Sequence, residues 1–159
     1  MSATSSVRKK PLKSQTAPFE FAALYRASPL ARIDVIKAGV PARDAKKLSA
    51  ALHFDQQLMF DALQLKTATV NRKALRNERL STEDSERVVG LAKLVGQLLA
   101  TLEDAGSSEE FDASSWMSHW LLQPLPALGG NKPLDLLDTM EGQSLVSRAL
   151  SQIQSGAYA

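Results

Sequence analysis

The residues best suited to chemistry form a basic, hydrogen-bonding run in the middle of the chain. Arg72 can donate twice to guanine, and Asn71 can both donate to and accept from adenine. Lysine and arginine side chains also neutralise the phosphates of a DNA backbone. The run therefore predicts contacts with duplex DNA from seven side chains: Lys66, Thr67, Thr69, Asn71, Arg72, Lys73 and Arg76.

The sequence contains few of the residues and motifs that are typical of an enzyme active site. The chain has no cysteine, and its two histidines, His53 and His119, lie in different halves without a neighbouring metal ligand. No glycine-rich phosphate loop, dinucleotide-binding motif or HExxH zinc motif is present. We therefore expect a protein that is not an enzyme, that binds no metal or cofactor and that has no small-molecule substrate.

The charges divide the chain of 159 residues into a basic and an acidic half. Residues 1–80 contain 15 Lys and Arg against 6 Asp and Glu, a net charge of +9, whereas residues 81–159 contain 4 against 11, a net charge of −7. The basic half suits nucleic acid, and the acidic half suits a protein partner. No apolar run approaches the roughly 20 residues that span a bilayer. The N-terminus also lacks the apolar core of a signal peptide, so we expect a cytoplasmic protein without membrane contact.

The basic half begins with a polar arm. Residues 1–17 contain almost nothing apolar, which predicts disorder. The cations of this arm could follow a DNA backbone or could simply be solvated. A packed region of short helices is expected at residues 18–79, and residues 80–159 are expected to form the second region.

The first clear helix of the packed region begins at Ser28. This serine suits an N-cap, and Pro29 suits the first helical turn. Gly39 is the expected end of the helix. Apolar residues at helical spacing predict its inward face, which is formed by Leu30, Ile33 and Ile36.

The following helices suggest a helix-turn-helix. One opens after Pro41, the next is capped by Asp55, and Thr67 is expected to cap the helix that carries the DNA-contacting run. A short turn before a basic second helix is what a helix-turn-helix requires. Phe60 and Gln64 occupy positions where a small residue and a glycine are usual. The alternative interpretation is a basic helical bundle whose lysines are only solvated.

The longest predicted helix opens the acidic half. Ser81 and Asp84 resemble a capping pair, and an apolar stripe then continues for about six turns to Gly106, a rod of roughly 35 Å. Such a helix can be a structural spine, a dimer seam or both. A homodimer suits a helix-turn-helix protein, because two copies read two half-sites. The expected seam residues are Leu91, Val95, Leu98 and Leu102.

A short helix with two tryptophans is expected after an acidic loop. Ser114 or Ser115 is its predicted N-cap. Trp116 and Trp120 are four residues apart and therefore share a face. We interpret them as anchors of the core or of an interface, because nothing nearby suggests a cofactor site.

The last thirty residues carry strong turn signals. A loop at Gly129 and Gly130 precedes Pro133, which predicts the start of a helix that Gly142 stops. A second helix is expected to end at Gly156. Tyr158 follows that glycine as the last aromatic residue of the chain.

Several motifs of the second half stand in a fixed order and spacing: Leu80-Ser81, Ser85-Glu86-Arg87-Val88, Trp120-Leu121 with Pro124, Leu128-Gly129-Gly130, Pro133-Leu134-Asp135-Leu136-Leu137 and the segment from Gly142 to Gly156. With these motifs, residues 80–159 resemble the toxin-binding domain of the Xre/MbcA/ParS antitoxins. Residues 30–79 are similar to the Xre-like helix-turn-helix. The resemblance implies an all-α protein, in which an N-terminal helix-turn-helix bundle packs with a C-terminal toxin-binding domain.

The resemblance also implies a function, as the antitoxin of a bacterial type II toxin–antitoxin pair. The usual partner is a RES-domain toxin, an enzyme that depletes NAD, and such antitoxins typically repress their own operon by binding operator DNA. A toxin pocket for a phosphate-bearing dinucleotide should be electropositive, so acidic side chains and the end of the chain suit it. The expected toxin contacts are Asp135, Asp138, Glu141, Ala157, Tyr158 and Ala159.

Three alternatives stay open at this point. Tyr158 could fold back on the core of its own chain instead of entering a toxin pocket. The protein could be a dimeric helix-turn-helix regulator whose C-terminal half serves only dimerisation. It could also be an all-helical adaptor with a vestigial helix-turn-helix.

Overall fold

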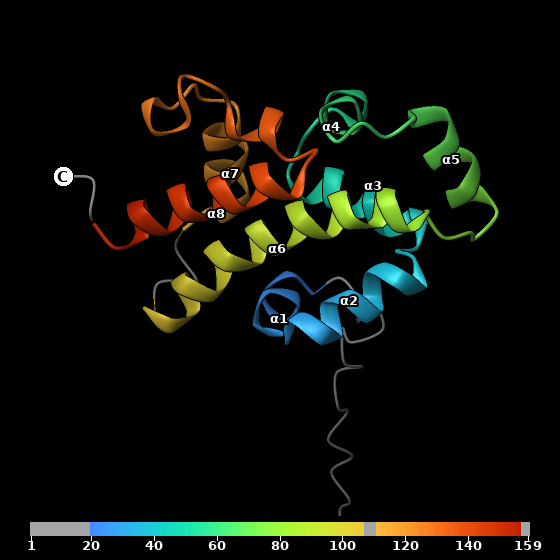
Figure 1. Ribbon diagram of the computed structural model, residues 1–159, viewed down its shortest axis with the longest axis horizontal. Coiled ribbons are helices and arrows are strands. Elements are labelled where there is room, and N and C mark those ends of the chain that lie inside the picture. Colours follow the sequence, from blue (N-terminus) through green and yellow to red (C-terminus); the bar gives the residue numbers. More distant parts are fainter. Residues whose placement is uncertain (1–19, 107–110, 157–159) are drawn as a thin grey trace, which may run out of the picture.

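The computed structural model describes residues 20–106 and 111–156, and these stretches form an all-α protein (Figure 1). Within them, the only strand-like feature is an isolated bridge between Pro41 and Arg79. The predicted fold class is confirmed. The predicted arm at residues 1–17 lies outside the described residues. None of the helices in the described stretches is long and apolar enough to cross a membrane.

The short helices of the N-terminal half follow their predicted end signals. Ser28 Oγ accepts a 3.1 Å hydrogen bond from the Ala31 amide, and Asp55 Oδ2 accepts a 3.2 Å bond from the Leu58 amide. Both predicted N-caps are therefore confirmed. Gly39 ends its helix with a φ of 86°. The helices of this half are α1 (Phe21–Arg26), α2 (Pro29–Ala38), α3 (Ala42–Ala51), α4 (Gln56–Ala62) and α5 (Thr67–Leu75).

A long helix, α6 (Thr82–Asp104), runs through the middle of the molecule (Figure 1). Ser81 Oγ accepts a 3.1 Å hydrogen bond from the Asp84 amide, as predicted. Gly106 follows the end of the helix with a φ of 70°. The 23 residues of α6 span about 35 Å. Both α1 and α2 pack against α6, as do α7 and α8 of the C-terminal half, so α6 is the structural spine.

The residues predicted to form a dimer seam on α6 lie inside the folded chain. Leu91, Val95 and Leu98 are at most 5% exposed, and Leu102 is half-buried against the same core. Neighbouring helices of the same chain cover these side chains. They cannot form a seam between two copies without opening the fold. The predicted dimer seam on this stripe of α6 is therefore wrong.

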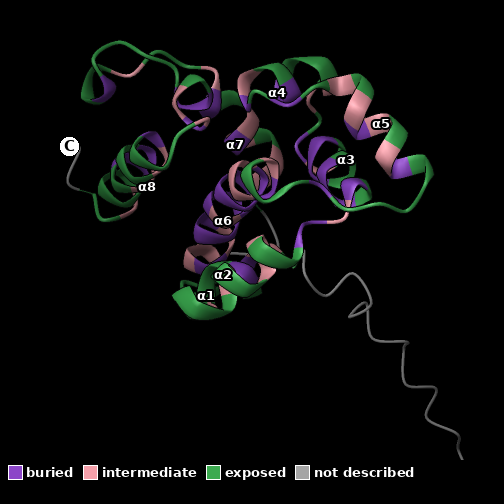
Figure 2. Cartoon of the chain, turned by 45° about the vertical axis from the view of Figure 1, so that its right-hand side comes forward, coloured by how far each residue is buried: buried purple, intermediate pink, exposed green. Residues whose placement is uncertain are grey.

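The predicted inward face of α2 is wrong for Leu30 and Ile33 and right for Ile36. Leu30 is 74% exposed and Ile33 is 42% exposed, and no residue of α2 is buried. Only Val35 and Ile36 pack, half-buried, against the core. The helix lies on the outside of α6 (Figure 2), so only part of its apolar spacing faces the core and Leu30 and Ile33 lie on the surface.

The C-terminal half wraps the other side of α6. Asp112, rather than Ser114 or Ser115, caps its first helix, because Asp112 Oδ1 accepts a 3.0 Å bond from the Ser115 amide. Gly156 follows the last helix with a φ of 71°, as predicted. The elements of this half are α7 (Ala113–Leu121), the short 3-10 helices η2 (Pro126–Leu128) and η3 (Pro133–Leu136), and α8 (Met140–Gln154).

The predicted helix stop at Gly142 is also wrong. Pro133 opens only η3, and Thr139 then caps α8 by accepting a 3.0 Å hydrogen bond from the Gly142 amide. A Cβ atom on Gly142 would lie 1.7 Å from the carbonyl oxygen of Leu136. Gly142 therefore lets η3 and α8 approach closely, and it lies within the first turn of α8.

One apolar core connects the two halves. It contains Leu48 and Phe60 from the N-terminal half, Leu91 from α6, and Leu134 and Leu150 from the C-terminal half. All five side chains are at most 1% exposed. The candidate DNA-contacting and partner-contacting surfaces are thus held on one packed body.

Candidate functional site

The turn between α4 and α5 is tight although its residues are bulky. Gln64 adopts a left-handed φ of 57°, a conformation in which glycine is usual. The Leu65 amide donates a 2.8 Å hydrogen bond to the Phe60 carbonyl, and both side chains are buried. Phe60 therefore serves the core, and Gln64 takes the place of a turn glycine.

Helix α5 is fixed to the bundle by its inner face and by its C-terminal end. Val70 and Ala74 are buried, as predicted. Arg43 Nε of α3 donates a 3.2 Å hydrogen bond to the Ala74 carbonyl, where a cation also complements the helix dipole. Thr67 does not cap the helix, contrary to prediction. Lys66 is the N-cap residue, and Thr67 Oγ1 is buried without a hydrogen-bond partner.

The predicted DNA-contacting residues divide into an exposed and a half-buried set. Arg72 of α5 and Arg76, the C-cap residue of that helix, are exposed and lie on the same side, because they are four residues apart. Lys66 is exposed at the N-terminal end of the helix. Cations in such positions suit phosphate groups. The half-buried set consists of Thr67, Thr69, Asn71 and Lys73.

Asn71 also holds the two helices of the motif together. Its Oδ1 accepts a 2.9 Å hydrogen bond from Gln56 Nε2, at the start of α4. Pairing with adenine needs both the acceptor and the donor of the amide. Asn71 would use the second lone pair of Oδ1 for that purpose, while Gln56 orients the amide. Gln56 is not among the predicted residues, because its only signal in the sequence is its place directly after the Asp55 cap.

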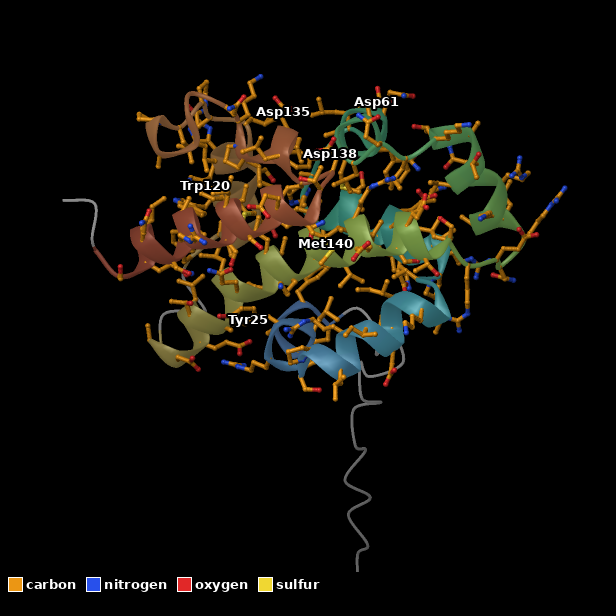
Figure 3. The ribbon with its side chains drawn as sticks, in the orientation of Figure 1. Tyr25, Asp61, Trp120, Asp135, Asp138 and Met140 are labelled. Atoms are coloured by element: carbon orange, nitrogen blue, oxygen red, sulfur yellow. The ribbon has the colours of Figure 1, made fainter. Side chains whose placement is uncertain are left out.

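An acidic groove of about 350 Å³ lies between α4 and η3. Two of the predicted toxin-contacting residues, Asp135 and Asp138, line it from the C-terminal half, and Asp61 lines it from α4 (Figure 3). Gln64 of the turn and Lys132 complete its polar lining. Asp61 is not among the predicted residues, because no local signal in the sequence links it to a segment so distant along the chain.

The other predicted toxin contacts are not part of this groove. Glu141 is exposed in the first turn of α8 and does not line it. Ala157, Tyr158 and Ala159 lie outside the described residues. Near the last turn of α8 there is an apolar groove of about 300 Å³, lined by Leu125, Pro126, Ala127, Ala149 and Ile153.

The two tryptophans belong to the core, as predicted. The rings of Trp116 and Trp120 stack with centroids 5.7 Å apart and planes inclined by 12°. Trp120 is 6% exposed, and Trp116 is half-buried against the core. His53 and His119 are both exposed. Within the described stretches, no group of three or more His, Asp or Glu side chains is arranged to hold a metal ion.

Each half of the chain matches a known protein-domain family. The Antitoxin Xre-like helix-turn-helix domain matches residues 31–93, and the Antitoxin Xre/MbcA/ParS C-terminal toxin-binding domain matches residues 109–156. The chain is also 68% identical, over 144 residues and 91% of each protein, to the Prs ADP-ribosylating antitoxin of Sphingobium sp. (strain YBL2). The chain belongs to the Xre/MbcA/ParS antitoxins. The resemblance found in the sequence is confirmed.

The grooves and the basic helix can now be placed within this Xre/MbcA/ParS antitoxin. Helices α4 and α5 lie in the helix-turn-helix match, while η3 and α8 lie in the toxin-binding match. The acidic groove is therefore lined by residues of both regions. The antitoxin combines a helix-turn-helix with a toxin-binding domain on a shared core.

Proposed function

We propose that this antitoxin neutralises a RES-type, NAD-depleting toxin by covering its active site with the C-terminal half. The observation that supports this best is the acidic groove, which gathers Asp61, Asp135 and Asp138 at the edge of the toxin-binding domain. A pocket that binds a phosphate-bearing dinucleotide is electropositive, and a carboxylate surface complements it. The name of the Sphingobium relative refers to ADP-ribosylation, a reaction whose usual donor is NAD, which is consistent with this choice of toxin.

The proposal extends to two further parts of the C-terminal half. Glu141 adds an exposed carboxylate on α8. Ala157, Tyr158 and Ala159 come after Ser155 and Gly156, which follow α8 in the sequence, and Tyr158 would offer an aromatic ring to a toxin pocket. In this proposal the antitoxin acts by binding and carries out no catalysis of its own.

Co-expression with the toxin tests this part of the proposal, with cellular NAD as the readout. The wild-type antitoxin is expected to preserve NAD. Deleting residues 157–159, or replacing Asp135 and Asp138 together by asparagine, is expected to let NAD fall. Asp34→Asn, at an exposed carboxylate on α2, is the matched control and should protect fully. Full protection by both test variants would contradict the proposed contact surface.

We also propose that the antitoxin represses its own operon by placing α5 on operator DNA as a homodimer. The exposed cations Lys66, Arg72 and Arg76 support phosphate contacts, and Asn71 supports base readout. Two copies would place two α5 helices on two half-sites.

A gel-shift titration with the upstream region of the gene, repeated over a salt series, tests the DNA proposal. Each phosphate contact contributes about −0.9 to the slope of log affinity against log salt. Arg72→Ala is expected to weaken binding and flatten the slope by about one contact, while toxin neutralisation stays intact. Lys37→Ala, at an exposed lysine on α2, is the control. Affinity that does not change with salt would exclude the basic face of α5 as a phosphate-binding surface.

A further inference from the structure

A second groove, of about 260 Å³, lies between α2 and α8 with α6 as its floor. Ile33 lines it from α2, Glu86 and Lys93 line it from α6, and Met140 lines it from α8. None of these residues is among the predicted toxin contacts or DNA contacts. The groove is therefore a surface that the proposed function leaves unused.

Two opposite charges in this groove have no partner within the described residues. Glu86 and Lys93 are both half-buried, and neither makes an ion pair or a hydrogen bond in that part of the chain. The nearby cation Arg32 is occupied, because its guanidinium donates to the carbonyls of Leu24, Tyr25 and Ala27. Burial, and then the charge of Arg32, lowers the pKa of Lys93. A carboxylate brought to Lys93 would compensate for this unfavourable setting.

The spacing of the two charges makes the groove complementary to itself. Glu86 and Lys93 are seven residues apart on α6, which places them on one face about 10.5 Å apart along the axis. Gly90 lies between them in the sequence and is buried beneath the side chain of Gln143 from α8. A two-fold axis perpendicular to α6 and midway between the two charges would set Glu86 of each copy against Lys93 of the other, as a symmetric interface requires.

Exposed apolar side chains border the same groove. Met140 is 64% exposed and Ile33 is 42% exposed, and both line the groove. Leu30, three residues before Ile33 on α2, is 74% exposed but does not line it. Figure 3 shows Met140 at the start of α8, beside α6. Large apolar side chains gathered around a groove are typical of protein–protein contact surfaces.

We propose that this groove is the interface between two copies of the antitoxin, closed by two reciprocal Glu86–Lys93 ion pairs. The inference rests on the proposed homodimer and specifies which surface the two copies share. The stripe of α6 that carries Leu91, Val95 and Leu98 cannot supply that face, because the chain itself buries it.

Charge reversal, read out as the mass of the full-length protein by sedimentation equilibrium, tests the interface. Glu86→Lys and Lys93→Glu each place like charges together twice per dimer, so each is expected to raise the dimer dissociation constant by at least about 100-fold. The double variant restores both pairs and should dimerise like the wild type. An equimolar mixture of the two single variants should form a heterodimer. Lys46→Glu, at an exposed lysine on α3, is the charge-matched control.

Circular dichroism and a thermal melt first establish that each variant is folded. Folded single variants that remain dimeric, or a folded double variant that remains monomeric, would overturn the interface. A wild-type protein that is monomeric at all concentrations would overturn both the interface and the homodimer. It would leave toxin neutralisation standing, since NAD protection is measured separately. Loss of toxin binding by the single variants with an unchanged dimer would assign the groove to the toxin and overturn the proposal.

Discussion

Gln97 of α6 and Ser147 of α8 each donate a hydrogen bond to the other. Ser147 Oγ donates to Gln97 Oε1 at 2.7 Å, and Gln97 Nε2 donates to the Ser147 carbonyl at 3.1 Å and to Ser151 Oγ at 2.8 Å. Gln97 is 2% exposed. A buried amide whose polar atoms are all satisfied fixes the position of α8 along α6, because any slip would leave it unpaired.

Gln97→Ala should therefore destabilise the protein. The substitution removes the bonds and leaves the Ser147 hydroxyl without its acceptor, at a cost of about 1–3 kcal/mol. Urea denaturation followed by circular dichroism measures the loss. Gln152→Ala, at an exposed glutamine on α8, should change stability by less than about 0.5 kcal/mol. Equal losses of stability in the two variants would mean that the buried hydrogen bonds of Gln97 do not contribute to the free energy of unfolding.

Gly142→Ala should be destabilising because a Cβ atom there meets the backbone of η3. The contact of 1.7 Å with the Leu136 carbonyl can be relieved only by moving η3 away from α8. We expect a loss of about 1–3 kcal/mol, as for other overpacked sites, measured from the shift in melting temperature. Ser144→Ala, at an exposed position in the same turn of α8, is the control. A melting temperature unchanged by Gly142→Ala would contradict the close approach.

Leu150→Ala tests the burial of α8. Leu150 is fully buried, and its truncation is expected to cost about 2–5 kcal/mol. Leu145 lies on the same helix and is 41% exposed, so Leu145→Ala should cost much less. Chemical denaturation of both variants provides the comparison. A small effect at Leu150 would indicate that α8 packs on a partner rather than on its own core.

Gln64→Gly should stabilise the turn of the helix-turn-helix. A residue with a side chain costs about 1–2 kcal/mol in the left-handed region, whereas glycine enters it freely but loses more chain entropy. The net gain should be about 0.5–1 kcal/mol. Gln57→Gly, inside α4, should have the opposite sign. Destabilisation by both substitutions would show that the Gln64 side chain matters more than its backbone.

Asp44 should make stability depend on pH. Burial raises its pKa, and Lys47, whose Nζ lies 3.7 Å from Asp44 Oδ1, opposes part of that rise. The folded state therefore binds the proton of this carboxyl more tightly than the unfolded state does. As a result, the folded protein becomes less stable as pH rises from the unfolded pKa, about 3.9, to the folded pKa of Asp44. Asp44→Asn removes this decline, so its stability relative to wild type should grow across that window. Melting temperatures between pH 3.5 and 7 measure the gap, and a gap that shrinks with rising pH would reverse the assignment.

Local signals in the sequence predict many of the helix ends, although the predicted caps at Thr67 and at Ser114 or Ser115 are wrong. Ser28, Asp55 and Ser81 cap helices in the structure because a cap depends only on residues three positions apart. Gly39 and Gly156 likewise follow helix ends with positive φ values. These features need no information from the rest of the fold.

Features that depend on distant contacts could not be predicted in this way. Leu30 and Ile33 have helical spacing, but whether that face points inward depends on where α2 lies on α6. The role of Gly142 depends on how close η3 comes to α8. The acidic groove joins Asp61 to Asp135 and Asp138 only after the core has formed.

The continuity of α6 has a mechanical consequence for the antitoxin. The helix-turn-helix match ends at residue 93, in the interior of α6, and the helix continues unbroken to Asp104, ahead of the toxin-binding match at residue 109. A rod of hydrogen-bonded turns resists bending, and the α8 helix is clamped onto it by Gln97. Within Thr82–Asp104 the helix thus contains no break that could act as a hinge. In the proposed function, a toxin bound by α8 would therefore lie at a fixed distance and orientation from α5, the helix proposed to contact DNA.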